Sequence, residues 1–313
     1  MLLLHLQEVD ENKWAERLGK FLGDYQIVTR NDEFDPGKIE YIFVWKPVDE
    51  AFEGLTNLKA VLCLGAGVDA LLTHEHLPKN VPIVRYVDDE LTRCMSDYVI
   101  ANVTMHHRGF SGFKNDQINK VWNQYYPPAA REISVGIMGL GVLGADAANQ
   151  LHSIGYQVSG WSRSAKNIAG VKGFYGEDQL DDFLGQSDIV VNLLPLTPNT
   201  SGILNYKNFQ KLRRGNLVGG PVIINAARGG HQDENDIVKA LNDGTIGAAS
   251  LDVFNVEPLP KTSELWELKN CYITPHIAAI SSPDSGAKYF SNIIRDHENG
   301  LPLVNLVDMT SGY

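Results

Sequence analysis

Short apolar runs alternate with stretches of helical periodicity along nearly the whole chain, and this alternation restricts the folds that are open to it. Most of the runs lack a regular exchange of polar and apolar residues, which is typical of strands buried on both faces. Helices between such strands place them side by side in one parallel sheet that is covered on both sides. The pattern therefore predicts an α/β protein built on doubly wound parallel sheets.

The runs form two series, separated by a long helical stretch at Met95–Phe110 and an irregular stretch at Asn115–Pro128. The first series comprises Leu2–Leu6, Tyr25–Thr29, Ile39–Trp45, Lys59–Leu64 and Val81–Val87. The second comprises Glu132–Met138, Tyr156–Trp161, Asp188–Leu193, Pro221–Asn225, Ala248–Val253 and Tyr272–Thr274. A length of 313 residues exceeds what one hydrophobic core usually organises, so two domains are expected. A last helical stretch at Pro283–Asn299 is expected to return to the first domain, which gives bounds of 1–98 plus 282–313 and 99–281.

The composition excludes several classes of function. With 27 Lys and Arg against 38 Asp and Glu, the formal net charge is −11, whereas a sequence-independent nucleic-acid binder needs a basic surface. No apolar run approaches the roughly 20 residues of a membrane span, and the N-terminus lacks the basic start of a signal peptide. Cys63, Cys94 and Cys271 lack the spacing of metal ligands, which favours buried thiols over a metal site. We therefore expect a cytoplasmic protein that binds neither nucleic acid nor a membrane.

A glycine-rich motif directly follows the run Glu132–Met138 and precedes a helical stretch. A strand, a glycine-rich turn and a helix in this order are typical of a dinucleotide-binding site. Gly139 allows the tight turn, Gly141 lets the backbone approach the pyrophosphate, and Gly144 lets helix and sheet pack closely. The N–H groups at the start of the helix then face the phosphates. The predicted cofactor-binding residues of this loop are Gly139, Gly141, Val142, Leu143 and Gly144.

The turn after the next strand bears on the choice between NAD and NADP. In an NAD site, an Asp or Glu about 20 residues after the glycine loop usually accepts a hydrogen bond from the ribose 2′-OH. Here Ser162, Arg163 and Ser164 stand in that region without a carboxylate. A guanidinium can bind a 2′-phosphate in a bidentate manner, and the serines can donate to it. The sequence therefore predicts that NADP(H) is preferred, with NAD(H) open as a second cofactor.

Three segments at successive strand ends carry residues suited to the reduction of an anionic ketone. Arg228 offers a permanent positive charge for a carboxylate and can polarise a carbonyl group. His276 can deliver a proton, since imidazole ordinarily titrates near neutral pH. Glu257 can orient that imidazole and stabilise its charged form. We predict these three residues as the catalytic set, while His231, close to Arg228, can be read either as a neighbour of the site or as a structural histidine.

These motifs together resemble those of the D-isomer-specific 2-hydroxyacid dehydrogenase family. The resemblance runs through the glycine loop and the segments Asn192–Thr200, Asn225–Gly229, Leu251–Leu259 and Thr274–His276. It implies a Rossmann cofactor domain inserted in a flavodoxin-like substrate domain, with Arg228 binding substrate and His276 donating the proton. It also implies that Asp252 contacts the nicotinamide carboxamide. The further cofactor residues implied by the match are Leu194, Pro195 and Ala226.

Five further segments, Val44–Pro47, Leu64–Asp69, Trp161–Ser164, Arg228–His231 and Pro275–Ala279, are most similar to those of the glyoxylate/hydroxypyruvate reductase A group within the family. The similarity implies an NADPH-dependent reduction of glyoxylate to glycolate and of hydroxypyruvate to D-glycerate. The N–H groups of Ala66, Gly67 and Val68 would bind the substrate carboxylate together with Arg228. Trp45 is a candidate wall of a small substrate pocket, and a core aromatic residue is the equal alternative.

The resemblance also bears on assembly and on competing functions. Met95–Phe110 and Asn115–Pro128 are similar to the dimerisation region of the family, which implies a homodimer. A larger 2-oxo acid, such as phenylpyruvate, stays open as the substrate. A non-catalytic protein that senses dinucleotides is the alternative from another class, and the complete set of Arg228, Glu257 and His276 argues against it.

Overall fold

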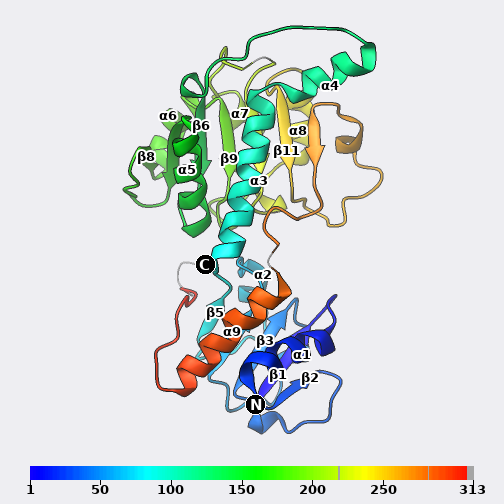
Figure 1. Cartoon of the computed structure of the whole chain (residues 1–313), viewed down its shortest axis with the longest axis vertical. Helices are drawn as coiled ribbons and strands as arrows, with labels where there is room; N and C mark the ends of the chain where they lie inside the picture. The colour runs from blue at the N-terminus through cyan, green and yellow to red at the C-terminus, as the bar shows by residue number, and fades with distance from the viewer. Residues whose placement is uncertain (218, 281, 309–313) are drawn as a thin grey trace. The chain divides into compact units, whose positions relative to one another are not determined.

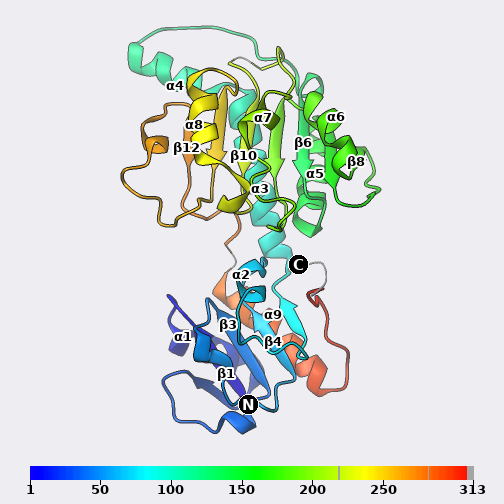
Figure 2. The same cartoon turned by 180° about the vertical axis from the view of Figure 1, so that it is seen from behind.

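The computed structural model describes residues 1–217, 219–280 and 282–308. The chain divides into two compact units (Figures 1 and 2): unit 1 holds Met1–Leu91 and Ser281–Tyr313, and unit 2 holds Thr92–Ile280. The first junction therefore falls inside the helix α3, Asp89–His107, whereas the sequence pattern placed it after residue 98. A continuous helix carries no turn signal that would mark such a junction in the sequence.

Unit 1 is built on a parallel sheet that, within its described residues, has five strands in the order β2-β1-β3-β4-β5. This order is the flavodoxin-like one, as the family resemblance implied. The strands are β1 (Leu2–Leu6), β2 (Ile27–Thr29), β3 (Tyr41–Trp45), β4 (Ala60–Cys63) and β5 (Ile83–Arg85). Its helices are α1 (Glu11–Leu22), the short α2 (Asp69–Leu72) and α9 (Pro283–Glu298).

Helix α9 is far from the rest of unit 1 in sequence and packs against it in space. The helix begins at a Ser282 cap, whose side chain accepts from the N–H of Ser285. Phe290 of α9 packs on Phe43 of β3 with ring centroids 4.6 Å apart, and Arg17 of α1 forms an ion pair with Asp284 at 3.0 Å. Helix α9 therefore packs within unit 1, although it follows unit 2 in the chain.

Unit 2 contains a parallel sheet with, in the part of the chain that the structure describes, seven strands in the order β12-β11-β10-β9-β6-β7-β8. The chain starts at β6, moves outward through β7 and β8, and then crosses back to β9 on the other side of β6. This reversal is the topological switch point at which doubly wound sheets bind dinucleotides. The strands are β6 (Ser134–Met138), β7 (Gln157–Ser162), β8 (Val171–Tyr175), β9 (Ile189–Asn192), β10 (Val222–Asn225), β11 (Ala248–Leu251) and β12 (Cys271–Ile273).

Helices cover both faces of the sheet in unit 2, as Figures 1 and 2 show. One hydrophobic cluster joins α3 and α5 (Val142–Ile154) to the sheet, for example through Val99 and Ala148. A second cluster, on the other face, joins α6, α7 and α8 to the sheet. These three helices are Leu180–Gly185, Tyr206–Phe209 and Glu234–Asn242. The two clusters explain why the strands of this unit are apolar on both sides.

Two expectations from the sequence are wrong in detail. The edge strand β8 was missed because, of its five residues, only Phe174 is buried, so its apolar signal is weak. The stretch Asn115–Pro128 was expected to be irregular, but its first residues belong to the helix α4, Phe110–Asn119. Every residue of α4 is at least partly exposed, so the amphipathic pattern that normally reveals a helix is absent there.

No helix in the described part of the chain is long and apolar enough to cross a membrane.

Candidate active site

The glycine-rich loop lies between β6 and α5, next to the switch point of the sheet in unit 2. Gly139 has a φ of 97°, and a Cβ there would lie 2.6 Å from the carbonyl oxygen of Leu193. At Gly144 a Cβ would lie 1.8 Å from the carbonyl oxygen of Gly139. Gly141 is different, because a Cβ built on it meets nothing within 4 Å. Two of the glycines are therefore required by the fold, while the third borders open space at the start of α5.

This difference predicts opposite outcomes for two matched variants. Gly144→Ala is expected to lower the free energy of unfolding by about 3 kcal/mol or more, since the new methyl group overlaps a backbone carbonyl. Gly141→Ala is expected to leave the free energy of unfolding within about 0.5 kcal/mol of the parent. The same variant is expected to weaken NADPH binding, because its methyl group fills the space that a pyrophosphate needs. Urea unfolding and fluorescence titration measure the two effects, and equal stability of both variants would contradict the packing argument.

The turn after β7 carries the residues predicted to select NADP. Ser162 is buried, and its hydroxyl group donates to the carbonyl oxygen of Ser164 at 2.8 Å. That hydrogen bond closes the turn, and Arg163 and Ser164 lie exposed on it. The hydroxyl proton of Ser162 is thus used within the turn, which leaves Arg163 and Ser164 as the candidate donors to a 2′-phosphate.

A chain of buried amide groups connects the ends of three neighbouring strands. Asn192, after β9, donates from Nδ2 to Oδ1 of Asn225 at 3.0 Å. Asn225 donates from its own Nδ2 to Oε1 of Gln232 at 2.8 Å, and Gln232 donates to the carbonyl oxygen of Val253 at 3.0 Å. Buried amides that are bonded in this way fix the loops between them. The loops in question carry the predicted cofactor residues Leu194, Pro195 and Ala226.

Arg228 stands at the start of a short 3₁₀ turn, Gly229–His231, directly after β10. Its carbonyl oxygen accepts from Nδ2 of Asn225 at 3.1 Å and also lies 3.1 Å from Nδ1 of His231. A Cβ at Gly229 would lie 2.0 Å from the carbonyl carbon of Phe254, so the backbone after β11 packs directly on this turn. The backbone of Arg228 is thereby held from two sides.

His231 is completely buried and lies between two loops of the site. Its second ring nitrogen, Nε2, is 3.2 Å from the carbonyl oxygen of Pro195. Of the two readings left open by the sequence, the structural one fits these contacts, since the ring connects the Arg228 turn to the loop after β9.

Glu257 and His276 meet in unit 2. Oε2 of Glu257 lies 2.8 Å from Nδ1 of His276, and the two side chains are 37% and 47% exposed. Nδ1 therefore carries a proton directed at the carboxylate, and Nε2 is the ring nitrogen left to exchange a proton with a ligand. Glu257 also accepts from the N–H of Phe254 at 3.0 Å, which orients its carboxylate.

Asp252 holds the backbone around His276. Its side chain is 1% exposed and accepts from the N–H groups of Ile277 and Ala278, both at 2.9 Å, and from the hydroxyl group of Thr274 at 2.6 Å. A carboxylate offers about four lone-pair sites, so the donors among the described residues leave one on Oδ2. His276 itself has a φ of 55°, a left-handed conformation that is uncommon for residues other than glycine.

The parallel register brings these groups to one edge of the sheet. β9, β10, β11 and β12 are consecutive neighbours in unit 2, and the loops that follow all four strands leave from the same edge. The predicted residues Arg228, Asp252, Glu257 and His276 follow three of these strands. Within the described residues, no cluster of three or more His, Cys, Asp and Glu side chains is arranged to hold a metal ion.

The remaining predicted residues lie in unit 1, in the loop after β4 and at the end of β3. Ala66 and Val68 stand in this loop, and a Cβ at Gly65 would lie 2.8 Å from Cζ3 of Trp45 and 3.1 Å from the carbonyl oxygen of Gly67. The indole ring therefore packs directly against the loop. Trp45 is half-buried, which favours its reading as a wall beside the loop over a residue of the core.

Five supporting residues of the site were missed in the sequence: Tyr98, Asn192, Asn225, Gln232 and Thr274. The buried amides Asn192 and Asn225 stand at the ends of apolar runs, where a polar residue costs free energy unless it is paired. A polar residue at the end of an apolar run could therefore have indicated these amides from the sequence alone. No comparable signal marks Tyr98, which lies on α3 and reaches Thr274 at a separation of 176 residues.

Comparisons with known proteins identify the family of the chain. Residues 100–278 match the model described as "D-isomer specific 2-hydroxyacid dehydrogenase, NAD binding domain". Glyoxylate/hydroxypyruvate reductase A of Yersinia enterocolitica is 39% identical over 284 residues, which cover 89% of each protein. An NADPH-dependent glyoxylate/hydroxypyruvate reductase from Sinorhizobium meliloti, solved with NADP and sulfate, is 40% identical, with a TM-score of 0.92 over 100% of this chain and 99% of that one.

A probable 2-hydroxyacid dehydrogenase from Rhizobium etli, solved in complex with NADP, HEPES and L(+)-tartaric acid, is 42% identical. Its TM-score is 0.93, over 100% of this chain and 99% of that one. The family model and the relatives together span both sheets and every segment of the site. The chain therefore belongs to the D-isomer-specific 2-hydroxyacid dehydrogenase family.

Proposed function

We propose that the protein is an NADPH-dependent reductase of small 2-oxo acids, which converts glyoxylate to glycolate and hydroxypyruvate to D-glycerate. The observation that carries the proposal is the His276–Glu257 pair, 2.8 Å apart, in the same unit as a glycine loop of the dinucleotide-binding type. The names of the relatives from Yersinia enterocolitica and Sinorhizobium meliloti supply the substrates. Unit 2 is then the cofactor domain, and unit 1 the substrate domain.

The residues present fit a dinucleotide. The space at Gly141 and the N–H groups at the start of α5 suit a pyrophosphate, and Arg163 and Ser164 suit a 2′-phosphate. The free lone-pair site on Asp252 suits the N–H of a carboxamide. Leu194, Pro195 and Ala226 would line the site between these ends. When bound, the reduced nicotinamide supplies the hydride that the protein itself lacks.

The side chains of this chain then perform the remaining steps. Arg228 binds the substrate carboxylate and polarises the carbonyl group, and a hydrogen bond from its Nη1 to the carbonyl oxygen of Ala227 at 2.8 Å orients the guanidinium. The N–H groups of Ala66, Gly67 and Val68 are further donors to a carboxylate. Nε2 of His276 delivers a proton to the oxygen that becomes the hydroxyl group, while Glu257 stabilises the imidazolium.

Steady-state turnover with NADPH tests the proposal. We expect oxidation of NADPH that depends on glyoxylate or hydroxypyruvate. We expect a higher kcat/KM for glyoxylate than for phenylpyruvate, because a larger side chain must clear Trp45, the proposed wall of the substrate pocket, which packs against the loop at Gly65. No turnover with any small 2-oxo acid would refute the proposed function. A preference for phenylpyruvate would keep the chemistry and overturn the proposed substrate.

The cofactor preference gives a separate prediction at Arg163. We expect Arg163→Gln to raise KM for NADPH about tenfold and to leave KM for NADH nearly unchanged, since one Arg–phosphate contact supplies about 1.4 kcal/mol or more. Paired kinetics with both cofactors measure the effect. Lys166→Gln, an exposed change three residues away, is the matched control. Equal losses with both cofactors would exclude Arg163 as the 2′-phosphate residue.

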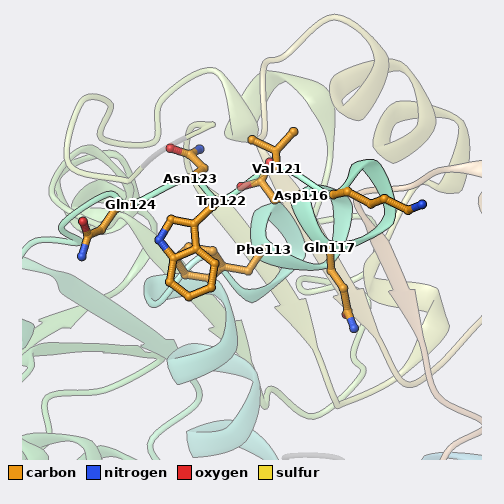
Figure 3. A pocket seen from close by; sticks show the side chains of 8 residues that line it. Phe113, Asp116, Gln117, Val121, Trp122, Asn123 and Gln124 are labelled. Atoms are coloured by element: carbon orange, nitrogen blue, oxygen red, sulfur yellow. The ribbon is translucent and has the colours of Figure 1, made fainter.

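We further propose a cytoplasmic homodimer that uses the α4 segment, residues 110–126. Trp122 and Tyr126 are 95% and 87% exposed, and a hollow of about 520 Å³ beside Trp122 is lined by residues of this segment alone (Figure 3). Phe113 stacks on Tyr125 with ring centroids 5.0 Å apart, so the segment folds back on itself and still exposes its apolar side chains. Such a patch is typical of an interface, and a second copy of the chain is the proposed occupant. Sedimentation equilibrium should give a mass of two chains.

A further inference from the structure

A line of hydroxyl groups leads from α3 to the carboxylate of Asp252. The hydroxyl oxygen of Tyr98 lies 2.8 Å from Oγ1 of Thr274, and Oγ1 of Thr274 lies 2.6 Å from Oδ1 of Asp252. Tyr98 is half-buried on α3, and Thr274 directly follows β12. Three residues from three separate segments of unit 2 are thus joined by two hydrogen bonds.

The direction of both hydrogen bonds follows from the donors that are present. The carboxylate of Asp252 also faces the N–H groups of Ile277 and Ala278, so it acts as the acceptor, and Thr274 must give it the single hydroxyl proton. Oγ1 of Thr274 can then only accept from Tyr98. Burial raises the pKa of Tyr98 to about 12, so its hydroxyl group retains the proton at neutral pH and can donate.

The residues that donate hydrogen bonds to the Asp252 carboxylate lie on both sides of His276 in the sequence. Thr274 precedes this residue by two positions, and Ile277 and Ala278 follow it directly. The backbone N–H of His276 also donates to the carbonyl oxygen of Asp252 at 2.8 Å. Since a φ of 55° is unfavourable for histidine, the turn depends on these bonds to keep its shape. The position of the His276 ring therefore depends on Asp252, which in turn depends on Thr274.

We propose that Tyr98 is a positioning residue, which orients Thr274 and, through Thr274 and Asp252, fixes the turn that presents His276. The inference rests on the proposed function only in that the turn is taken to present a proton donor. Tyr98 is in none of the segments that carry the motifs of the site, and its connection to the His276 turn runs through Thr274 and Asp252.

Two readouts test the proposal, and the first does not depend on turnover. In protein with labelled histidine, Tyr98→Phe and Thr274→Val are expected to shift the NMR signals of the His276 ring. Tyr156→Phe is the matched control, because Tyr156 is also buried in unit 2 and loses a hydrogen bond to His107 of 2.9 Å. Thr274→Ser keeps the hydroxyl group and is expected to keep the parent signals. Unchanged His276 signals in both Tyr98→Phe and Thr274→Val would overturn the proposal.

The second readout is the kinetics of glyoxylate reduction. We expect Tyr98→Phe to lower kcat about three- to tenfold, the range of one hydrogen bond, with a smaller change in KM for NADPH and a melting temperature no lower than that of Tyr156→Phe. Thr274→Val should lower kcat further, and Thr274→Ser should restore it. A loss of kcat in Tyr98→Phe that the Tyr156→Phe control matches would show a general packing effect and refute the positioning role. If the parent protein reduces no 2-oxo acid, the proposed function fails, while the NMR comparison still decides the role of Tyr98.

Discussion

Replacing His276 with asparagine is expected to lower kcat for glyoxylate reduction by about 10²- to 10⁴-fold, the usual contribution of a positioned general acid. Asparagine suits the test because it tolerates the left-handed backbone conformation of residue 276 better than most side chains. The loss therefore reports the missing proton donor and not a distorted turn. Because residue 276 is assigned to proton transfer, the affinity for NADPH should stay close to that of the parent.

Glu257→Gln refines the same prediction. Glutamine can still accept a hydrogen bond from Nδ1 of His276, but it lacks the negative charge that stabilises an imidazolium. An intermediate loss of kcat is expected. His76→Asn, an exposed change in unit 1, is the control and should leave kcat unchanged. Near-parental turnover in His276→Asn would exclude His276 as the proton donor.

Replacing Arg228 with glutamine is expected to lower kcat/KM for glyoxylate roughly 30- to 3,000-fold. Loss of one partner of a desolvated charge pair costs about 2–5 kcal/mol, and about 1.4 kcal/mol corresponds to a factor of ten. KM for glyoxylate should rise, since Arg228 is assigned to the substrate carboxylate, and KM for NADPH should change little. Steady-state kinetics at varied glyoxylate and fixed saturating NADPH measure both effects.

Two further variants separate the charge of Arg228 from its shape. Arg228→Lys keeps the positive charge and loses the planar fork, so a smaller loss of kcat/KM is expected. Arg131→Gln, at an exposed position of unit 2, is the control for a general loss of charge. If Arg228→Gln raised KM for NADPH and left KM for glyoxylate unchanged, the assignment of Arg228 to the substrate would be wrong.

Most of the fold could be predicted because buried parallel strands have a strong local signature. The apolar runs gave every strand except β8, where Lys172 and Gly173 interrupt a run with one buried residue. The sheets of both units confirm the doubly wound α/β architecture that the pattern predicts. Helix α4 was missed in part for the opposite reason, since it has no buried face to produce a periodic pattern.

The candidate site was predictable to the extent that its chemistry stands in short motifs. Arg228, Glu257 and His276 each follow a strand, so chain order alone places them at one edge of a sheet. The contacts that hold them join segments distant in the sequence, such as Asn225 to Asn192 and Gly229 to Phe254. No local pattern encodes such a contact, because each partner is an ordinary residue in its own segment.

The buried amides that connect β9, β10 and the loop after β11 carry no net charge. At 0.1 M salt, dissolved ions largely screen exposed charges that lie more than about 10 Å apart, but they have little influence on bonds between neutral buried groups. Ionic strength therefore acts differently on two parts of the same site. Added salt weakens the capture of anions by Arg228 and Arg163, while the arrangement of the loops beneath them is preserved. A fall in apparent affinity at high salt, without a matching fall in kcat, would then measure electrostatic capture in an intact site.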